Sequence, residues 1–211
     1  MKSTLQAKAW RFFGLLSVVL EQKLHSIFRR RLRKVRFRLD AEGNLKFFSL
    51  GNGCRFDVPV RVGGGHGEIV IEDGAGFGWL AASYVGKGTI LLEPRSLGAK
   101  IKVGAETMFS NNVSIIAMRS VIIGKRCLIG ELTTIIDCDF HETHPDKRIT
   151  GVGPIEPVLI ADNVWIGSRV LILRGVSIGK NSIVGAGSVV TRNIPANSIA
   201  VGVPAKVIKT L

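Results

Sequence analysis

A six-residue repeat in the C-terminal part of the chain limits the folds that it can adopt. An aliphatic residue recurs every six positions, and the residue after it is usually small. The aliphatic members of this run are Ile160, Ile166, Ile172, Ile178, Val184 and Val190. This period fits neither the 3.6-residue turn of an α-helix nor the two-residue alternation of a strand. It predicts a triangular coil in which each repeat forms one flat side and three repeats complete a turn.

The same period extends upstream in two runs that are separated by a two-residue shift. These runs are Val85, Leu91, Leu97, Val103, Phe109 and Ile115, and then Ile123, Ile129 and Ile135. In such a coil the aliphatic side chains point inward and stack on their equivalents in neighbouring coils. The small residue that follows permits a tight corner, where a Cβ atom would crowd the next coil. We therefore expect an all-β solenoid, a parallel β-helix, over residues 41–211.

The repeat is interrupted between Ile135 and Ile160, and residues 137–157 are predicted to form one extruded loop. Prolines and glycines are frequent in this segment, which argues against continuation of the coil. The loop begins with the sequence DCDFHETHPDKR, which contains two of the four histidines of the chain. Loops held by a rigid scaffold often carry functional residues, so this loop is the first candidate for a site.

The N-terminal segment, residues 1–40, differs in composition from the remainder. It holds 11 basic and 2 acidic residues, a net +9 of the +13 carried by the whole chain. The concentration of charge outside the repeat weakens a nucleic-acid-binding interpretation, which would place a basic face on the fold itself. The apolar stretch 12–20 is about half the length that spans a bilayer, and no signal-peptide cleavage site follows it.

Apolar residues of this segment recur at helical spacing and predict an amphipathic basic α-helix. They are Trp10, Phe13, Leu16, Leu20, Leu24, Ile27 and Phe28, and seven Lys or Arg residues follow within 29–38. Two interpretations stay open at this point. The helix contacts an anionic membrane surface, or it packs on its own oligomer or a neighbouring domain with its cations in solvent.

The three cysteines, Cys54, Cys127 and Cys138, are odd in number and far apart, and they show no zinc-binding spacing. A reduced, cytoplasmic setting is the simplest interpretation. Cys138 lies close to the histidines, where a nucleophilic role has to be considered. A small, partly buried thiol is the more frequent role for such a residue.

The C-terminal sequence resembles a known family. The stretch VLIADNVWIGSRVLILRGVSIGKNSIVGAGSVVTRNIPANSIAVGVPAKVI is similar to hexapeptide-repeat acetyltransferases, whose fold is a left-handed parallel β-helix. The similarity is greatest to galactoside and maltose O-acetyltransferases and to O-acetyltransferases of bacterial surface polysaccharides. It covers roughly residues 62–208 and excludes the basic segment. It implies a homotrimer with sites between subunits, acetyl-coenzyme A as donor, no metal, and a histidine that takes the proton of a saccharide hydroxyl.

Histidine suits this task because its unperturbed pKa lies near neutrality. The D-x-D-F-H motif of the polysaccharide enzymes resembles residues 137–141 and nominates His141 as the base. The T-x-x-H-P motif of the galactoside enzymes resembles the THP sequence and nominates His144 instead. Alignment of the repeats with the galactoside pattern favours His141. Asp139 or Glu142 is expected to orient its imidazole, although a backbone carbonyl would serve equally well.

The resemblance also implies positions that bind the two substrates. For the acceptor these are Ser110 and Asn112, where Ser110 replaces the asparagine that is usual in the family. For coenzyme A they are Gly167, Ser168, Gly185, Ala186, Thr191, Arg192, Lys206 and Lys209. Backbone N–H groups near Gly167 are the expected oxyanion donors. Trp165 is expected to pack between subunits or to shape the cleft, and residues 146–148 to lie at the surface.

The sequence therefore predicts an acetyl-CoA-dependent O-acetyltransferase of surface polysaccharide or lipopolysaccharide biosynthesis, cytoplasmic or peripheral at the inner membrane. One alternative is a non-catalytic β-helix scaffold or membrane-recruited assembly module, which would need neither His141 nor the cofactor cations. Another is an N-acetyltransferase that acts on an amino-sugar nucleotide. A γ-type carbonic anhydrase shares the coil but needs three zinc-binding histidines, and no suitable third histidine is present.

Overall fold

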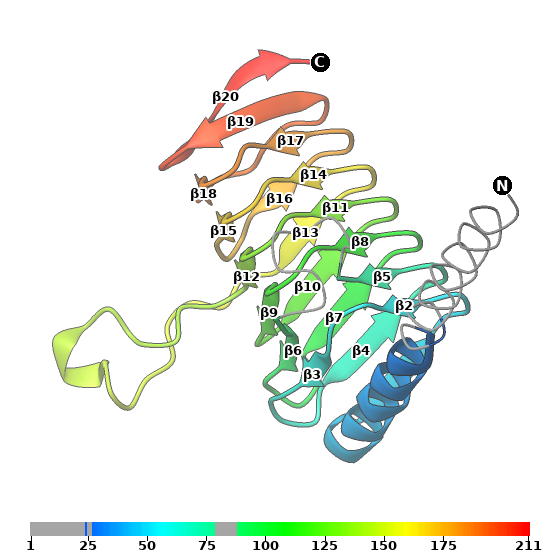
Figure 1. The fold of residues 1–211 in the computed structure, drawn as a ribbon. Coiled ribbons are helices and arrows are strands. Elements are labelled where there is room, and N and C mark those ends of the chain that lie inside the picture. The colour runs from blue at the N-terminus through cyan, green and yellow to red at the C-terminus, as the bar shows by residue number, and fades with distance from the viewer. Residues whose placement is uncertain (1–23, 25–26, 79–87) are drawn as a thin grey trace, which may run out of the picture.

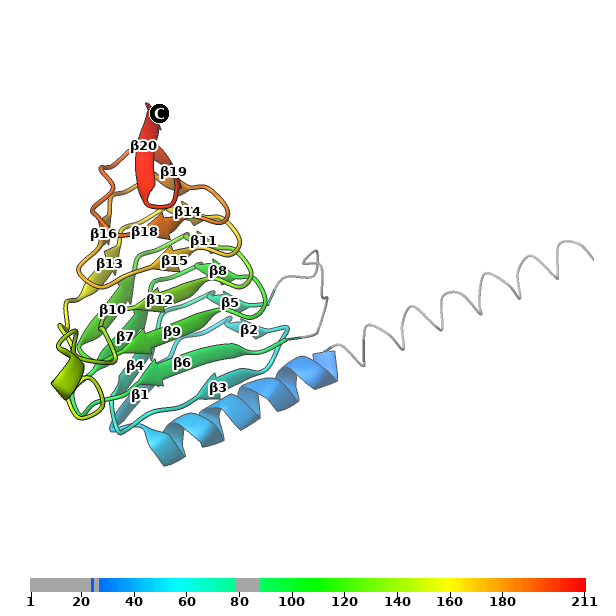
Figure 2. The ribbon, with the colours of Figure 1, turned by 90° about the vertical axis from the view of Figure 1, so that its left-hand side faces the viewer.

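Three parallel sheets form the faces of a tapering triangular solenoid (Figures 1 and 2). The computed structural model describes residue 24 and residues 27–78 and 88–211. The first sheet contains β1 (Phe47–Leu50), β4 (Glu68–Ile71), β7 (Lys100–Val103), β10 (Ser120–Ile123), β13 (Val158–Ile160) and β16 (Ser177–Ile178). The second contains β2 (Arg55–Phe56), β5 (Gly76–Phe77), β8 (Met108–Phe109), β11 (Leu128–Ile129), β14 (Trp165–Ile166), β17 (Ile183–Val184), β19 (Ser198–Gly202) and β20 (Ala205–Thr210). The third contains β3 (Val60–Val62), β6 (Ile90–Pro94), β9 (Ser114–Ala117), β12 (Thr134–Ile136), β15 (Leu171–Ile172) and β18 (Val189–Val190).

The register of the strands confirms the predicted coil in the C-terminal part. Ile160 pairs with Ile178, Ile166 with Val184 and Ile172 with Val190, so equivalent residues lie eighteen positions apart on all three faces. Each of these side chains is buried in one continuous apolar core. Three six-residue repeats therefore make one turn of the solenoid. The last coil ends in the antiparallel hairpin of β19 and β20.

The prediction made from the upstream repeat is only partly correct. Val103, Phe109 and Ile115 are buried as predicted, but Leu97 is 76% exposed. In β6 the buried side chains are Ile90 and Leu92, so the predicted inward residue Leu91 is shifted by one position. The reason is that coils in this part are longer than eighteen residues: Leu92 pairs with Ile115, twenty-three positions later. Val85 lies outside the described residues.

Glycines at the corners allow consecutive coils to approach closely. A Cβ atom on Gly130 would lie 2.4 Å from the carbonyl carbon of Gly167 in the next coil. One on Gly167 would lie 2.6 Å from the backbone nitrogen of Ala186, one coil further. Both distances are shorter than any normal carbon contact, so a larger residue would push the coils apart. The small residue of the repeat is thus required by backbone packing.

The N-terminal helix (residues 27–44) covers the open end of the first coil (Figure 2). Its Phe37 and Ala41 side chains are fully buried and belong to the core of the solenoid. Phe37 extends a column of rings that continues through Phe56, Phe77 and Phe109, with neighbouring centroids 5.1–5.2 Å apart. A terminal cap of this kind shields the apolar edge that a solenoid would otherwise expose.

The opposite face of the helix is apolar and exposed, with Arg and Lys residues on either side of it. Exposed apolar residues spaced by three or four positions run along this face and at described residue 24 before it; they are Leu24, Phe28, Leu32, Val35 and Leu39, and we call them the apolar stripe. Residues 27–39 contain no carboxylate. The predicted apolar residues Trp10, Phe13, Leu16 and Leu20 lie outside the described residues. Among the residues that are described, no helix is long and apolar enough to cross a bilayer.

Candidate functional site

The extruded segment is a two-stranded arm that projects from the solenoid between β12 and β13 (Figure 1). Its two legs are joined by backbone hydrogen bonds: Asp139 N–H donates to the Pro154 carbonyl, and Gly153 N–H donates to the Asp139 carbonyl. The tip is a 3₁₀ helix, Pro145–Lys147. The arm that follows Ile136 agrees with the loop predicted for residues 137–157.

Asp137 fixes the point at which the arm leaves the coil. Its carboxylate is fully buried and accepts hydrogen bonds of 2.7 Å from the backbone N–H groups of Met118, Arg119 and Ser120. These groups belong to the turn between β9 and β10 and to the first residue of β10. A buried carboxylate is tolerated where hydrogen bonds replace its hydration. Asp137 is therefore a structural anchor, a role that no feature of the sequence predicted.

Arg174 holds the two legs of the arm together. Its Nε atom donates to Asp139 at 2.8 Å, and its Nη1 atom binds Glu156 on the other leg. The hydrogen bond and the charge of Asp139, together with Glu156, raise the pKa of the Arg174 guanidinium. A second contact comes from Arg95, whose guanidinium carbon lies 4.7 Å from the centre of the Phe140 ring. Neither arginine was singled out in the sequence, because both are distant from the motif along the chain.

His141 lies exposed on the first leg of the arm, and one of its ring nitrogens is already bound. Its Nδ1 atom is 2.8 Å from the carbonyl oxygen of Arg148. A carbonyl oxygen only accepts, so in the neutral ring Nδ1 carries the proton and Nε2 carries the free lone pair. The expected partners Asp139 and Glu142 do not hold this ring: Asp139 binds Arg174, and the backbone supplies the contact instead. His141 thus presents a free basic nitrogen to solvent.

His144 lies at the tip of the arm, before the 3₁₀ helix, with 62% of its side chain exposed. Its nearest charged neighbour is Asp146, whose carboxylate lies 3.9 Å from Nδ1. Asp146, Lys147 and Arg148 are exposed, as predicted. The two histidines therefore differ in that only His141 has a ring nitrogen fixed by a hydrogen bond.

Cys138 is buried inside the root of the arm. It is 1% exposed, and its burial together with the charge of Asp137 raises the pKa of its thiol to about 11. The thiolate is the nucleophilic form of cysteine, and this environment disfavours it. Cys138 has the character of a packed apolar residue.

A second group of predicted residues lines the corner between the second and third sheets. Gly167 and Ser168 follow β14, while Gly185 and Ala186 follow β17 in the next coil. Gly187 N–H donates to the Ser168 carbonyl, so the two turns stack directly. Ser168 is half-buried and Ala186 is exposed. The result is a flat strip of backbone with small side chains.

A shallow apolar cavity of about 340 Å³ lies on the second sheet beside this corner. It is lined by Met108, Phe109, Ser110, Leu128, Ile129, Gly130 and Trp165. Trp165 is 53% exposed, in agreement with a role in shaping a cleft. Ser110 faces this cavity, whereas the Asn112 side chain accepts a hydrogen bond of 3.2 Å from Thr89 N–H. The two predicted acceptor-binding residues thus have different surroundings.

The predicted cofactor cations are exposed. Thr191 and Arg192 follow β18 at the corner between the third and first sheets, on the same side as the root of the arm. Lys206 and Lys209 lie on β20. Within the described ranges, no carboxylate forms an ion pair with Arg192, Lys206 or Lys209, so all three remain available to an anionic ligand.

Within one chain, the structure does not bring all these residues together. The arm that carries His141 leaves the solenoid at the corner between the third and first sheets. Gly167 and Ser168 lie at the opposite edge of the third sheet. The arm also points away from its own solenoid (Figure 1). A base on the arm and a ligand on the glycine-rich corner therefore lie at opposite edges of the third sheet within one chain. In the part that the structure describes, no group of three potential metal ligands occurs.

The chain matches a known family model over part of its length. Residues 157–192 match the family described as bacterial transferase hexapeptide (six repeats). Galactoside O-acetyltransferase of Escherichia coli (strain K12) is 40% identical over 116 residues, which cover 55% of this chain and 57% of that protein. The chain thus spans a little over half the length of the curated relatives it matches.

Two solved structures extend the comparison. A galactoside acetyltransferase in complex with coenzyme A is 41% identical, with a TM-score of 0.50, over 52% of this chain and 55% of that chain. The polySia-specific acetyltransferase NeuO is 25% identical, with a TM-score of 0.57, over 78% of this chain and 82% of that chain. These similarities and the repeat confirm the predicted hexapeptide-repeat, left-handed β-helix fold.

Proposed function

Because this chain is a hexapeptide-repeat protein similar to sugar O-acetyltransferases over about half its length, we propose that it transfers an acetyl group from acetyl-CoA to a saccharide hydroxyl. The observation that carries the proposal is the state of His141. Its Nδ1 atom is held by the Arg148 carbonyl, which leaves Nε2 free to act as a general base. The similarity to polysaccharide acetyltransferases supports a glycan acceptor, and we place the reaction in surface polysaccharide or lipopolysaccharide synthesis.

The proposed reaction is a direct transfer. His141 Nε2 takes the proton of the acceptor hydroxyl while the hydroxyl oxygen attacks the thioester carbonyl. The new C–O bond forms, the C–S bond breaks, and the departing thiolate takes the proton back from the imidazolium. Backbone N–H groups near Gly167 would stabilise the oxyanion that develops on the carbonyl. Buried Cys138 takes no part, so no acetyl-cysteine intermediate is formed.

The glycine-rich corner fits the extended donor. Gly185 and Ala186 present little side-chain volume, so a pantetheine arm can lie along the backbone strip they form. Arg192, Lys206 and Lys209 are exposed and free of ion pairs among the described residues, which suits the phosphates of coenzyme A. Acetyl-CoA is a substrate of the reaction, and the proposed chemistry needs no metal.

We propose further that the active form is a cytoplasmic homotrimer. Support comes from the separation of the arm and the glycine-rich corner on opposite edges of the third sheet. A neighbouring copy would supply the missing half of the site, and rotation by a three-fold axis would complete three equivalent sites.

The N-terminal helix supports peripheral contact with an anionic membrane. The apolar stripe is exposed and has Arg and Lys on both flanks, with no carboxylate between residues 27 and 39. This charge pattern is complementary to anionic lipid headgroups and unfavourable for pairing with an identical helix. We expect the protein to float with phosphatidylglycerol vesicles and not with phosphatidylcholine vesicles. Flotation that does not depend on lipid charge would contradict the contact.

Matched histidine variants test the proposed function. His141→Ala should lower the rate of thiol release from acetyl-CoA in the presence of acceptor sugars by about 100-fold or more, because a general base is lost. His144→Ala should retain activity within a few-fold, because its ring is not fixed on the arm. Both residues are exposed, so both variants should keep the oligomeric state of the wild type, which size-exclusion chromatography checks.

The reverse ranking, an inactive His144→Ala and an active His141→Ala, would refute the assignment of the base. A screen of free sugars, nucleotide sugars and lipid-linked oligosaccharides then identifies the acceptor. Isothermal titration with acetyl-CoA tests whether the protein is an enzyme or a non-catalytic scaffold. A folded wild-type protein that binds no acetyl-CoA would favour the non-catalytic scaffold over the enzyme.

A further inference from the structure

A second cavity is lined by residues of the N-terminal helix and of β3, none of which belongs to the arm or the glycine-rich corner. Figure 2 shows the helix beside β3. Its volume is about 370 Å³. It is lined by Arg29, Leu32, Arg33, Arg36, Pro59, Val60, Arg61 and Thr89. We call it the arginine cavity, because four of these eight residues are arginines and none is acidic.

The helix presents three of the arginines on one face. Arg29, Arg33 and Arg36 follow the spacing i, i+4, i+7, which places them side by side along two helical turns. Arg61 faces them from β3, and its only carboxylate neighbour among the described residues is Asp40, at 3.8 Å. Arg29 and Arg36 form no ion pair with any described residue. Two of the four arginines that line the cavity, Arg29 and Arg36, therefore lack an ion-pair partner among the described residues.

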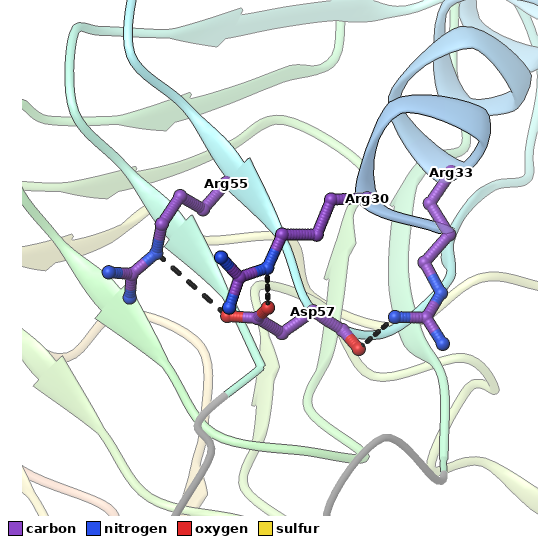
Figure 3. A network of polar contacts seen from close by, with 4 residues as sticks. All are labelled: Arg30, Arg33, Arg55 and Asp57. Atoms are coloured by element: carbon purple, nitrogen blue, oxygen red, sulfur yellow. Dashed lines mark hydrogen bonds and ion pairs between the residues drawn. The ribbon is translucent and has the colours of Figure 1, made fainter. Parts of the chain in front are cut away.

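Asp57 pairs with Arg30, which does not line the cavity, and its charge also acts on Arg33, which does (Figure 3). Its buried carboxylate pairs with Arg30 and lies 3.8 Å from Arg55. Arg33 instead donates to the backbone carbonyl of Asp57, which carries no net charge. Burial and the nearby charge of Arg29 lower the pKa of the Arg33 guanidinium, although Asp57 opposes this. Repulsion of this kind is relieved when an anion enters.

We propose that the arginine cavity binds a phosphate ester, and that the ligand is a diphosphate. Guanidinium groups bind phosphate oxygens through paired N–H donors, and each offers five N–H groups. A diphosphate offers more terminal oxygens and more negative charge than one phosphate ester, which suits a cavity lined by four guanidinium groups. Pro59, Val60 and Leu32 provide apolar walls beside the guanidinium groups.

Two sources could supply this group, a lipid headgroup or a soluble diphosphate ester such as an activated sugar. Leu32 belongs both to the cavity wall and to the apolar stripe. The cavity therefore opens beside the surface proposed to face lipid, where a phosphorylated headgroup could reach it. This ligand site is independent of acetyl transfer, because none of its residues belongs to the arm or the glycine-rich corner.

The experiment uses inorganic pyrophosphate and the full chain. Isothermal titration should give saturable binding of pyrophosphate, tighter than that of orthophosphate. The Arg29→Gln/Arg36→Gln variant should bind pyrophosphate at least about tenfold more weakly, a change of about 1.4 kcal/mol. Neither side chain forms an ion pair with a described residue, so this variant should fold, which circular dichroism and thermal melting check.

The matched control is Arg31→Gln/Arg38→Gln, which removes the same charge from exposed positions outside the cavity. It should bind pyrophosphate within about twofold of the wild type. Equal weakening by both double variants would reduce the effect to general charge attraction and overturn the proposal. The absence of pyrophosphate binding at a concentration of about 5 mM would also overturn the proposal.

Competition distinguishes the two sources. If pyrophosphate displaces the protein from vesicles that contain diacylglycerol diphosphate, and the Arg29→Gln/Arg36→Gln variant binds those vesicles weakly, the cavity takes a lipid headgroup. If a soluble nucleoside diphosphate competes for pyrophosphate while the vesicles do not, the ligand is soluble. Either result supports a phosphate site, and neither depends on whether the protein transfers acetyl groups.

Discussion

His141 and Asp139 lie two positions apart, yet their side chains bind different partners. The imidazole contacts the Arg148 carbonyl from the other side of the arm, and the carboxylate contacts Arg174 in the next coil. The contact with Arg174 fixes the root of the arm, and the contact with the Arg148 carbonyl occupies only one nitrogen of the His141 ring. At the scale of single residues, the Arg148 carbonyl sets the tautomer of the candidate base, and the Asp139 carboxylate stabilises the fold of the arm.

Cys138 allows a prediction at the same scale. Its raised pKa, about 11, keeps the thiol protonated in the folded protein, so only about one molecule in a thousand is thiolate at pH 8. Burial also raises the pKa values of Cys54 and Cys127. We expect slow reaction of all three cysteines with a disulfide reagent at pH 8, an increase toward pH 11, and rapid reaction in denaturant. Rapid labelling of Cys138 in the folded protein at pH 8, located by mass spectrometry, would contradict this assignment.

The N-terminal helix shows how one element serves two functions through opposite faces. One face caps the solenoid through Phe37 and Ala41, and the other carries the exposed apolar stripe. Its arginines divide in the same way, since Arg30 pairs with buried Asp57 while Arg29 and Arg36 line the arginine cavity. The helix is therefore part of the folded core, although its sequence suggests a separate basic segment.

Two phenylalanines of this helix separate its two faces experimentally. Phe37→Ala should lower the free energy of unfolding by about 3 kcal/mol or more, because it removes a fully buried ring from the aromatic column. Phe28 is 60% exposed, so Phe28→Ala should change stability by only about 0.5 kcal/mol. Phe28→Ala should nevertheless weaken flotation with phosphatidylglycerol vesicles. Denaturant titration and flotation measure the two effects; equal loss of stability in both variants would mean that the apolar stripe is also buried in the native assembly.

At the scale of the whole molecule, the solenoid places its candidate groups on separate edges. The arm leaves one edge of the third sheet, and the glycine-rich corner occupies the other. A rigid β-helix cannot bend to close this separation within one chain, because its coils are fixed by continuous ladders of backbone hydrogen bonds. Oligomerisation is the simplest way to assemble a complete site.

Subunit complementation tests this arrangement. His141→Ala removes the base of the arm, and Ala186→Trp fills the exposed corner at which acetyl-CoA is proposed to lie. Each variant alone should be inactive. A mixture refolded or expressed together in equal amounts should recover about one quarter of wild-type activity, because one interface in four then combines an intact arm with an intact corner. Assays of the mixture that remain at the level of the single variants would instead place the whole site within one chain.

The sequence determined the architecture of the upper coils because its constraints there are local. An aliphatic residue must face the core at each side of the triangle, and a small residue must occupy corners such as Gly130 and Gly167, where the next backbone passes close by. Both constraints repeat every six positions and can be counted. The same counting located the arm, between Ile135 and Ile160.

Only the tertiary structure decided which groups meet across long stretches of chain. The Arg148 carbonyl on His141, Arg174 across the two legs and Asp137 beneath the β9–β10 turn involve contacts that no periodicity encodes. The predictions that Leu91 and Leu97 point inward were wrong for the same reason. Coils in that part are longer than eighteen residues, and only the pairing of the strands shows by how much the register shifts. The arginine cavity likewise exists only because the helix folds back onto β3, which brings Arg29 and Arg36 beside Arg61.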